Sequence, residues 1–266
     1  SGVLQTQGVN IILNLFFGPA VNAARGIALQ IETAVTQLAN SIVSSVNPQI
    51  IKAYAAQKLD NMHILLCRST KFVFFLLLIL SLPLFFEADF FIDIWLVEVP
   101  EHTTNFLRIL LTGILVDMAA NSLYTGIQAT GKIRSFVFLN SGIRLFILPI
   151  AYLCLKLGAM PESVFIVQIC FWYITQIPRL IILHRLVKLP YKLFFRKALL
   201  PIVLVTSASF TVLIPLSLSI EHDTWLTACL MVVTSVLFTI GCIFVFGLTK
   251  SERVEVLKIS KKIIKK

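Results

Sequence analysis

Apolar runs of membrane-crossing length follow one another along most of this chain and are separated by short polar stretches. A helix needs about 20 predominantly apolar residues to cross a bilayer. Hydrophobic residues make up 58% of the 266 residues and charged residues 14%, and the mean hydropathy is +0.90. Soluble domains are far less apolar. We therefore expect an all-α integral membrane protein.

Eight crossing helices are predicted from these runs. The first is diluted by polar residues, so an amphipathic segment on the membrane surface is the alternative for it. Gln7, Asn10 and Asn14 nevertheless follow helical spacing and would form one polar stripe that faces protein or water rather than lipid. The predicted spans are residues 2–18, 21–46, 70–92, 103–129, 134–156, 162–186, 197–220 and 224–248.

The first two predicted spans meet at Gly18 and Pro19. Glycine costs backbone entropy in a helix and proline lacks the amide hydrogen, so this pair predicts a tight turn. Asn14 and Arg25 flank the turn. An arginine at the centre of a membrane helix costs roughly 2.5 to 3.5 kcal/mol on insertion scales. Arg25 is therefore expected to have a polar partner or a ligand.

Basic residues are concentrated in alternate connections and in the tail, which together hold 19 of the 23 lysines and arginines. The opposite turns are acidic, with Lys156 as a basic exception. Short cytoplasmic loops carry an excess of basic residues, so we expect a multi-pass protein of the bacterial inner membrane with both ends in the cytoplasm. The basic set is Lys52, Lys58, Arg68, Lys71, Lys132, Arg134, Arg179, Arg185, Lys188, Lys192, Arg196, Lys197, Lys250, Arg253, Lys258, Lys261, Lys262, Lys265 and Lys266.

The net charge of +10 follows from this topology, so the basic composition does not predict a nucleic-acid partner. The basic tail is expected to rest on anionic membrane lipids. The five cysteines are scattered singly and the four histidines lie far apart. Neither a disulfide nor a metal site is predicted from such spacing.

No catalytic constellation is visible. Residues 126–132 resemble a phosphate-binding loop, but Ile133 replaces the required serine or threonine and an apolar helix takes the place of the strand. The longest internal loop is expected at residues 48–69, which is too short for a catalytic domain. We do not expect an enzyme.

Ionisable residues within the predicted spans are the candidates for function. Arg25 and Glu32 are seven residues apart and share one helix face, so they are expected to line a cavity or to face a polar partner. Asp117 and Arg144 fall at similar depth in one predicted hairpin. They would either neutralise each other as a structural ion pair or line the cavity. The face of Arg25 and Glu32 is extended by Asn22, Thr36, Asn40 and Asn47.

Three stretches carry a resemblance to a known family: residues 14–28, 47–54 and 128–133. In order and spacing they resemble the second half of bacterial polysaccharide flippases of the O-antigen and capsule type, in the multidrug, oligosaccharidyl-lipid and polysaccharide exporter superfamily. The resemblance covers essentially the whole chain. It implies a second six-helix lobe at 1–190, two additional helices at 191–249 and a cytoplasmic tail at 250–266. Because the chain also opens without methionine, an N-terminal lobe is expected to be missing.

By resemblance, the substrate is an undecaprenyl-pyrophosphate-linked oligosaccharide, flipped to the outer leaflet by alternating access. The cavity of such flippases tends to be cationic, although Glu32 and Asp117 offset Arg25 and Arg144 here. An ion-coupled multidrug exporter is the alternative, with Glu32 or Asp117 binding a proton or sodium ion. A non-transporting scaffold of a polysaccharide assembly complex is the second alternative function. No cofactor is expected. The predicted cavity-lining residues are Asn10, Asn14, Arg25, Glu32, Asn40, Asp117 and Arg144.

Overall fold

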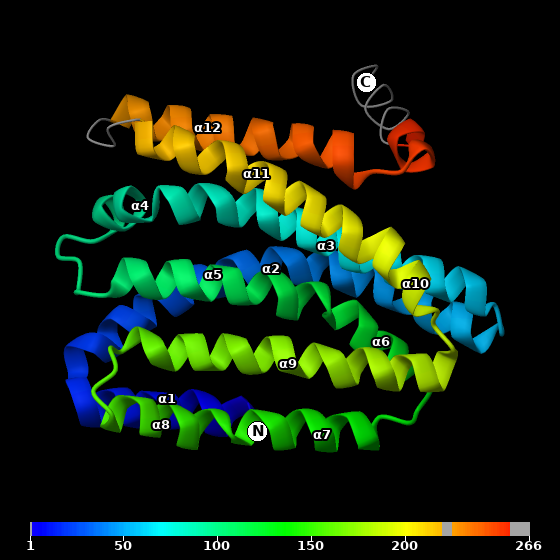
Figure 1. The fold of residues 1–266 in the computed structure, drawn as a ribbon, viewed down its shortest axis with the longest axis horizontal. Coiled ribbons are helices and arrows are strands. Elements are labelled where there is room, and N and C mark those ends of the chain that lie inside the picture. Colours follow the sequence, from blue (N-terminus) through cyan, green and yellow to red (C-terminus); the bar gives the residue numbers. More distant parts are fainter. Residues whose placement is uncertain (1, 220–224, 256–266) are drawn as a thin grey trace.

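A computed structural model describes residues 2–219 and 225–255 of the chain, and these residues are helical with short connections (Figure 1). Two of the helical segments, η1 and η2, are single π-helical turns. The elements are α1 (Gly2–Phe17), α2 (Pro19–Ala55), α3 (Leu59–Phe86), α4 (Ala88–Trp95), α5 (Thr103–Ala119), α6 (Asn121–Ala129), α7 (Arg134–Leu145), α8 (Ile147–Lys156), α9 (Glu162–Val187), α10 (Tyr191–Phe194), η1 (Phe195–Leu199), α11 (Leu200–Ser219), α12 (Trp225–Cys242) and η2 (Ile243–Gly247).

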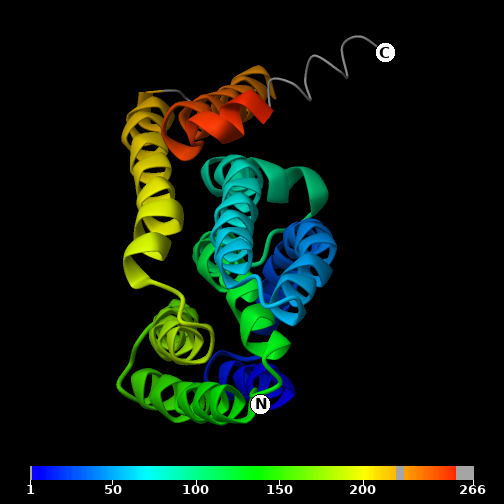
Figure 2. The same ribbon diagram turned by 90° about the vertical axis from the view of Figure 1, so that its right-hand side faces the viewer.

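The long helices lie side by side along the long axis of the molecule, so that most connections fall at its two ends (Figure 1). Helices α2, α3 and α5 pack against one another, and α9 packs on α5, α7 and α8. Helices α11 and α12 lie at one edge, where α12 packs on α3 (Figure 2). This edge corresponds to the predicted two additional helices. The domain boundaries at residues 190 and 249 themselves stay a prediction.

Six helices among the described residues are long and apolar enough to cross a membrane, so the predicted number of eight is not found. Helix α1 has only 16 residues. Helix α2 has 37 residues, but polar side chains recur along it. The six are Leu59–Phe86, Thr103–Ala129, Arg134–Lys156, Glu162–Val187, Tyr191–Ser219 and Trp225–Gly247.

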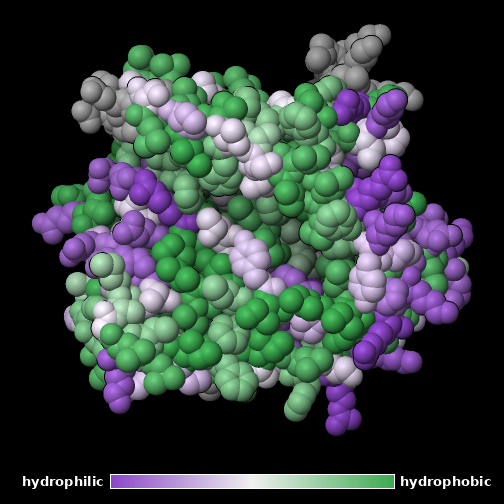
Figure 3. Space-filling model, in the orientation of Figure 1, coloured by the Kyte–Doolittle hydropathy of each residue, from purple (hydrophilic) through white to green (hydrophobic). Residues whose placement is uncertain are grey.

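The outer surface of the molecule exposes many large apolar side chains, as a surface in contact with lipid would. Large apolar side chains such as Phe138 and Leu218 are 80% and 83% exposed. Figure 3 shows an extensive hydrophobic surface across the middle of the molecule, with hydrophilic residues gathered toward the two ends. A protein that folds in water would bury much of this surface, because exposed apolar patches of this extent are rare in soluble monomers. The fold is therefore that of an all-α protein suited to a membrane.

The predicted turn at Gly18 is confirmed. Gly18 separates α1 from α2 with a φ of +82°, which favours glycine, and Pro19 occupies the first turn of α2. The predicted loop at 48–69 is wrong, because α2 continues to Ala55 and α3 begins at Leu59. Most of that polar stretch is helical. The helix predicted at 70–92 accordingly starts earlier and ends at Phe86.

Two predicted helices are interrupted in the middle. The segment 103–129 breaks at Ala120 into α5 and α6, and the segment 134–156 breaks at Phe146 into α7 and α8. No glycine or proline stands beside Ala120, so local sequence gives no sign of that break. Pro149, by contrast, follows the break at Phe146 by three residues and lacks the amide hydrogen for a helical bond across it. At Gly113 of α5, an added Cβ would lie 2.7 Å from Ile169. The absence of that side chain allows α5 and α9 to pack closely.

The connections rich in basic residues lie together at one end of the molecule, on the right in Figure 1. Several residues assigned to those connections are nevertheless inside helices. Among them, Arg68 and Lys71 lie in α3 and Arg179 lies in α9. Lys71 is 1% exposed and Arg179 is 6% exposed. Segregation of the other described basic residues of this set supports the predicted topology, while the side of the membrane to which each end faces stays a prediction.

Candidate functional site

A largely buried ion cluster joins three helices in the fold. Asp117 on α5 accepts a hydrogen bond from Arg144 on α7, with 3.0 Å between Oδ1 and Nη2. The same Oδ1 lies 3.7 Å from Nη2 of Arg179 on α9. The side chains of Asp117, Arg144 and Arg179 are 21%, 19% and 7% exposed. Since arginine stays protonated in proteins, this cluster carries two positive charges against one negative charge.

Each of the three helices is perturbed beside its charged residue. Asp117 lies three residues before the break at Ala120, and Arg144 lies two residues before the break at Phe146. Arg179 directly follows Pro178, which cannot donate the usual backbone hydrogen bond within α9. Binding sites in membrane transporters are commonly built where helices are interrupted. The cluster has the helix geometry of such a site.

Several polar atoms around the cluster are buried and lack a hydrogen-bond partner among the described residues. Arg179 leaves Nε and Nη1 unpaired, and Arg144 leaves Nε unpaired. Buried polar groups normally have a partner, which is protein, water or a ligand. Four of the six atoms are donors, so the vacant positions favour an acceptor such as an anion or water. The full set is Asn140 Oδ1, Arg144 Nε, Trp172 Nε1, Gln176 Oε1, Arg179 Nε and Arg179 Nη1.

Aromatic side chains support the two arginines. The Arg144 guanidinium lies 5.9 Å from the ring centroid of Trp172, and that of Arg179 lies 5.4 Å from the ring centroid of Phe136. Such cation–π contacts contribute roughly 0.5–2 kcal/mol, more when the site is dry. They hold the guanidinium groups in place without consuming their hydrogen-bond donors.

A second polar contact ties α1 to α2. Arg25 is buried and donates to the side-chain oxygen of Asn10 and, at 3.5 Å, to the backbone oxygen of Thr6. Asn22 donates to the backbone oxygen of Asn10 at 3.0 Å. The expected partner of Arg25 is thus Asn10 of the preceding helix. The Nε of Arg25 has no hydrogen-bond partner among the described residues.

Glu32 connects the two groups electrostatically. It is half-buried on α2, forms no hydrogen bond or ion pair with another described residue, and interacts through its charge with both Asp117 and Arg25. Helices α2 and α5 pack against each other along this region. Glu32 is therefore close enough to influence both clusters but is neutralised directly by neither.

The predicted site residues are brought together only in part. Asp117 pairs with Arg144, and Asn10 pairs with Arg25. Asn14 and Asn40 are exposed and lie apart from these contacts. The polar face of α2 is also divided, because Asn47 accepts a hydrogen bond from Thr125 of α6 at 2.8 Å and is used in packing.

Arg179 was missed as a site residue because it was counted with the basic loop. It nevertheless lies within the span predicted at 162–186, and that position was the signal that it lies inside a helix. Asn140, Trp172 and Gln176 were also missed. The pairs 140–144 and 172–176 each have a spacing of four, which places their members on one helix face.

An apolar pocket of about 210 Å³ adjoins the cluster between α3, α5, α9 and α11. Gln176 and Val116 belong to its lining, and Thr70 contributes a buried hydroxyl without a partner among the described residues. No group of three or more histidine, cysteine, aspartate or glutamate side chains suited to a metal ion occurs in the described part of the chain.

Comparison of the chain with protein-family models, curated proteins and solved structures finds no match.

Proposed function

We propose that this chain is the second lobe of a flippase that moves undecaprenyl-pyrophosphate-linked oligosaccharide repeat units across the bacterial inner membrane, for surface polysaccharide synthesis. The observation that supports this function most strongly is the excess positive charge of the Asp117–Arg144–Arg179 cluster inside apolar helices. Buried charge at membrane depth is costly and is usually retained for function.

A pyrophosphate suits the hydrogen-bonding groups that the cluster leaves vacant. Guanidinium groups bind phosphate oxygens through two parallel hydrogen bonds, and such charge-assisted bonds are about twice as strong as neutral ones. Arg144 and Arg179 retain unpaired donors, whereas Asp117 partly neutralises them when no ligand is bound. Arrival of the diphosphate would replace one internal counter-ion by another. That exchange keeps the cost of the empty site low.

The exposed face of α2 fits an interface with the expected N-terminal lobe. Gln30, Thr33 and Gln37 are exposed there and line an open groove of about 350 Å³. A polar helix face turned toward lipid would be unfavourable, because polar groups in the bilayer core lack water as a partner. In alternating access the two lobes rock about a site between them. The α2 face is the surface that the partner lobe would cover.

The experiment is complementation of a flippase-deleted strain with the full-length protein that contains this chain. Arg179→Ala should abolish surface polysaccharide at normal expression, whereas Arg179→Lys, which keeps the charge but loses the planar fork, should retain part of it. Arg185→Ala is the control, because Arg185 lies on the same helix but is exposed. Normal export by the Arg179→Ala protein would remove the cluster from the transport site.

The ion-coupled exporter of the same superfamily is the second candidate, favoured by the half-buried and unpaired carboxylate of Glu32. In that case Glu32→Gln should abolish proton- or sodium-dependent efflux of cationic compounds and leave polysaccharide unchanged. A scaffold without transport activity would tolerate both Glu32→Gln and Arg179→Ala.

A further inference from the structure

The chain turns after η2 and brings a short helix at 250–255 against the first half of α3. Gly247 makes this approach possible, because an added Cβ would lie 2.7 Å from the ring of Phe75. Thr249 precedes the helix, and the carboxylate of Glu252 accepts a hydrogen bond from the backbone N–H of Thr249 at 2.8 Å. This bond is one half of a capping box, and the Thr249 hydroxyl donates to the same carboxylate at 2.9 Å.

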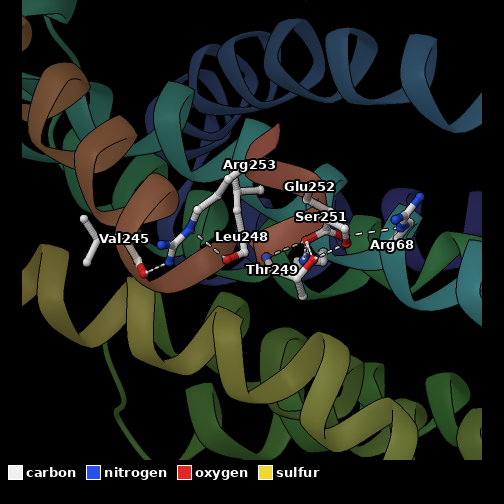
Figure 4. Close-up of polar contacts among 8 residues, drawn as sticks. Arg68, Val245, Leu248, Thr249, Ser251, Glu252 and Arg253 are labelled. Atoms are coloured by element: carbon white, nitrogen blue, oxygen red, sulfur yellow. Dashed lines mark hydrogen bonds and ion pairs between the residues drawn. The ribbon is translucent and has the colours of Figure 1, made fainter. Parts of the chain in front are cut away.

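The same carboxylate forms a buried ion pair with α3. Glu252 Oε2 lies 2.6 Å from Lys71 Nζ, and the two side chains are 4% and 1% exposed. Arg68, one turn earlier on α3, approaches Glu252 Oε1 with its Nε at 3.5 Å (Figure 4). Burial by itself would raise the pKa of Glu252, but hydrogen bonds from Lys71 and Thr249 and the charge of Lys71 bring that pKa below its usual value.

A pocket of about 180 Å³ lies beside this contact. Its lining contains three cationic side chains, Arg68, Lys71 and Lys197, and one carboxylate, that of Glu252. Glu252 neutralises one positive charge, so two remain. Lys197 is exposed and pairs with no described residue, and Arg68 contacts Glu252 through Nε alone, which leaves its two terminal nitrogens available.

Hydroxyl groups complete the wall. Ser251 and Thr249 both line the pocket, and their side-chain oxygens lie 3.2 Å apart. Two uncompensated cations with hydroxyl groups beside them form a chemical environment for a tetrahedral oxyanion. The pocket also lies at the basic end of the molecule, where an anionic lipid surface would concentrate phosphate groups.

We propose that this pocket binds a phosphate group, held by Arg68, Lys197 and Ser251 beside the Lys71–Glu252 pair. The phosphate is that of an anionic phospholipid headgroup or free phosphate. Binding there would fasten the C-terminal helix to α3. This site is built from other residues than the Asp117 cluster, so it does not depend on the transport function proposed above.

The test uses the purified full-length protein and two probes. Thermal unfolding is followed in neutral detergent with increasing inorganic phosphate at fixed ionic strength, and in nanodiscs of phosphatidylcholine with or without phosphatidylglycerol. The double variant Arg68→Gln/Lys197→Gln is compared with Arg185→Gln/Lys192→Gln, which removes two exposed charges at the same end of the molecule but outside the pocket.

The pocket variant should bind phosphate at least tenfold more weakly, or lose the stabilisation by phosphatidylglycerol, while the control behaves as wild type. A response to inorganic phosphate indicates the free ion, and a response to phosphatidylglycerol alone indicates the headgroup. If Arg68→Gln prevents folding, Lys197→Gln alone should still weaken binding. Equal losses in the two double variants, or no response of the wild type to either probe, would overturn the site.

Discussion

Replacing Glu252 by glutamine tests the buried ion pair with little other disturbance. Glutamine keeps an oxygen that can accept the hydrogen bond from Thr249 N–H, so the helix cap survives. Only the negative charge is lost. The Lys71 ammonium, which is 1% exposed, is then buried without a counter-ion. Removal of one partner from a buried pair costs about 3–5 kcal/mol. We expect a loss of about 3 kcal/mol, at the lower end of this range. The carboxylate no longer holds Arg68 near Lys71, so Arg68 can move away and repel it less.

A loss of that size lowers the folding equilibrium constant about a hundredfold, because about 1.4 kcal/mol corresponds to a factor of ten. Reversible unfolding in mixed micelles, followed by circular dichroism against the mole fraction of denaturing detergent, measures the difference. Glu255→Gln is the control, since Glu255 is exposed on the same helix, and it should stay within about 0.5 kcal/mol of wild type.

The double variant Lys71→Met/Glu252→Gln decides whether charge is the cause. It removes both ions and should regain most of the stability, because an apolar replacement for a buried pair is often neutral or stabilising. If Glu252→Gln costs no more than Glu255→Gln, or if adding Lys71→Met recovers nothing, the pair does not hold the C-terminal helix.

Three further predictions follow from the same contacts and topology. Asp117→Asn leaves Arg144 and Arg179 without their shared carboxylate and should lower the free energy of unfolding in mixed micelles by about 2 kcal/mol. The loss is smaller than for a fully buried pair because Asp117 is 21% exposed. An unchanged unfolding midpoint would contradict the ion cluster. Because the folded-state pKa of Glu252 is lowered, the stability that Glu252 contributes is present above the ordinary carboxyl pKa of about 4.3 and should disappear as the pH falls from there through the folded value. The difference in stability between wild type and Glu252→Gln should therefore close over that range. A constant difference down to low pH would refute the Glu252 ion pair as its source. Single cysteines at Asp60 and Lys188 should resist a membrane-impermeant thiol reagent in intact cells while one at Glu98 reacts, and the opposite labelling would reverse the orientation.

Local chemistry explains what could be predicted from the sequence. The turn at Gly18 and Pro19 was predictable because these residues are constrained by their own backbones. The long apolar helices were predictable because membrane thickness sets their length. Thr249 and Glu252 also have the spacing of a capping box, which predicts the start of a helix there.

Contacts between distant residues explain what could not be predicted. Lys71 and Glu252 are 181 residues apart, and nothing near Lys71 in the sequence shows that its charge is neutralised. Arg179 was counted with a basic connection although it lies within the predicted span 162–186, because counting charges does not distinguish a buried arginine from an exposed one. The break at Ala120 has no glycine or proline beside it, so it arises from packing rather than from local preference. The break at Phe146 was predictable, because Pro149 follows it by three residues.

Transport by the full-length protein in proteoliposomes tests the proposed function most directly. The substrate is an undecaprenyl-pyrophosphate-linked oligosaccharide, and movement is followed by the loss of lipid accessible to an added sugar-modifying reagent. We predict that wild-type protein flips this lipid and that Arg144→Ala/Arg179→Ala reduces the rate at least a hundredfold, while Arg185→Ala leaves it unchanged. Absence of flipping by the wild type, or a wild-type rate in the double variant, would contradict a phosphate-binding transport site at this cluster.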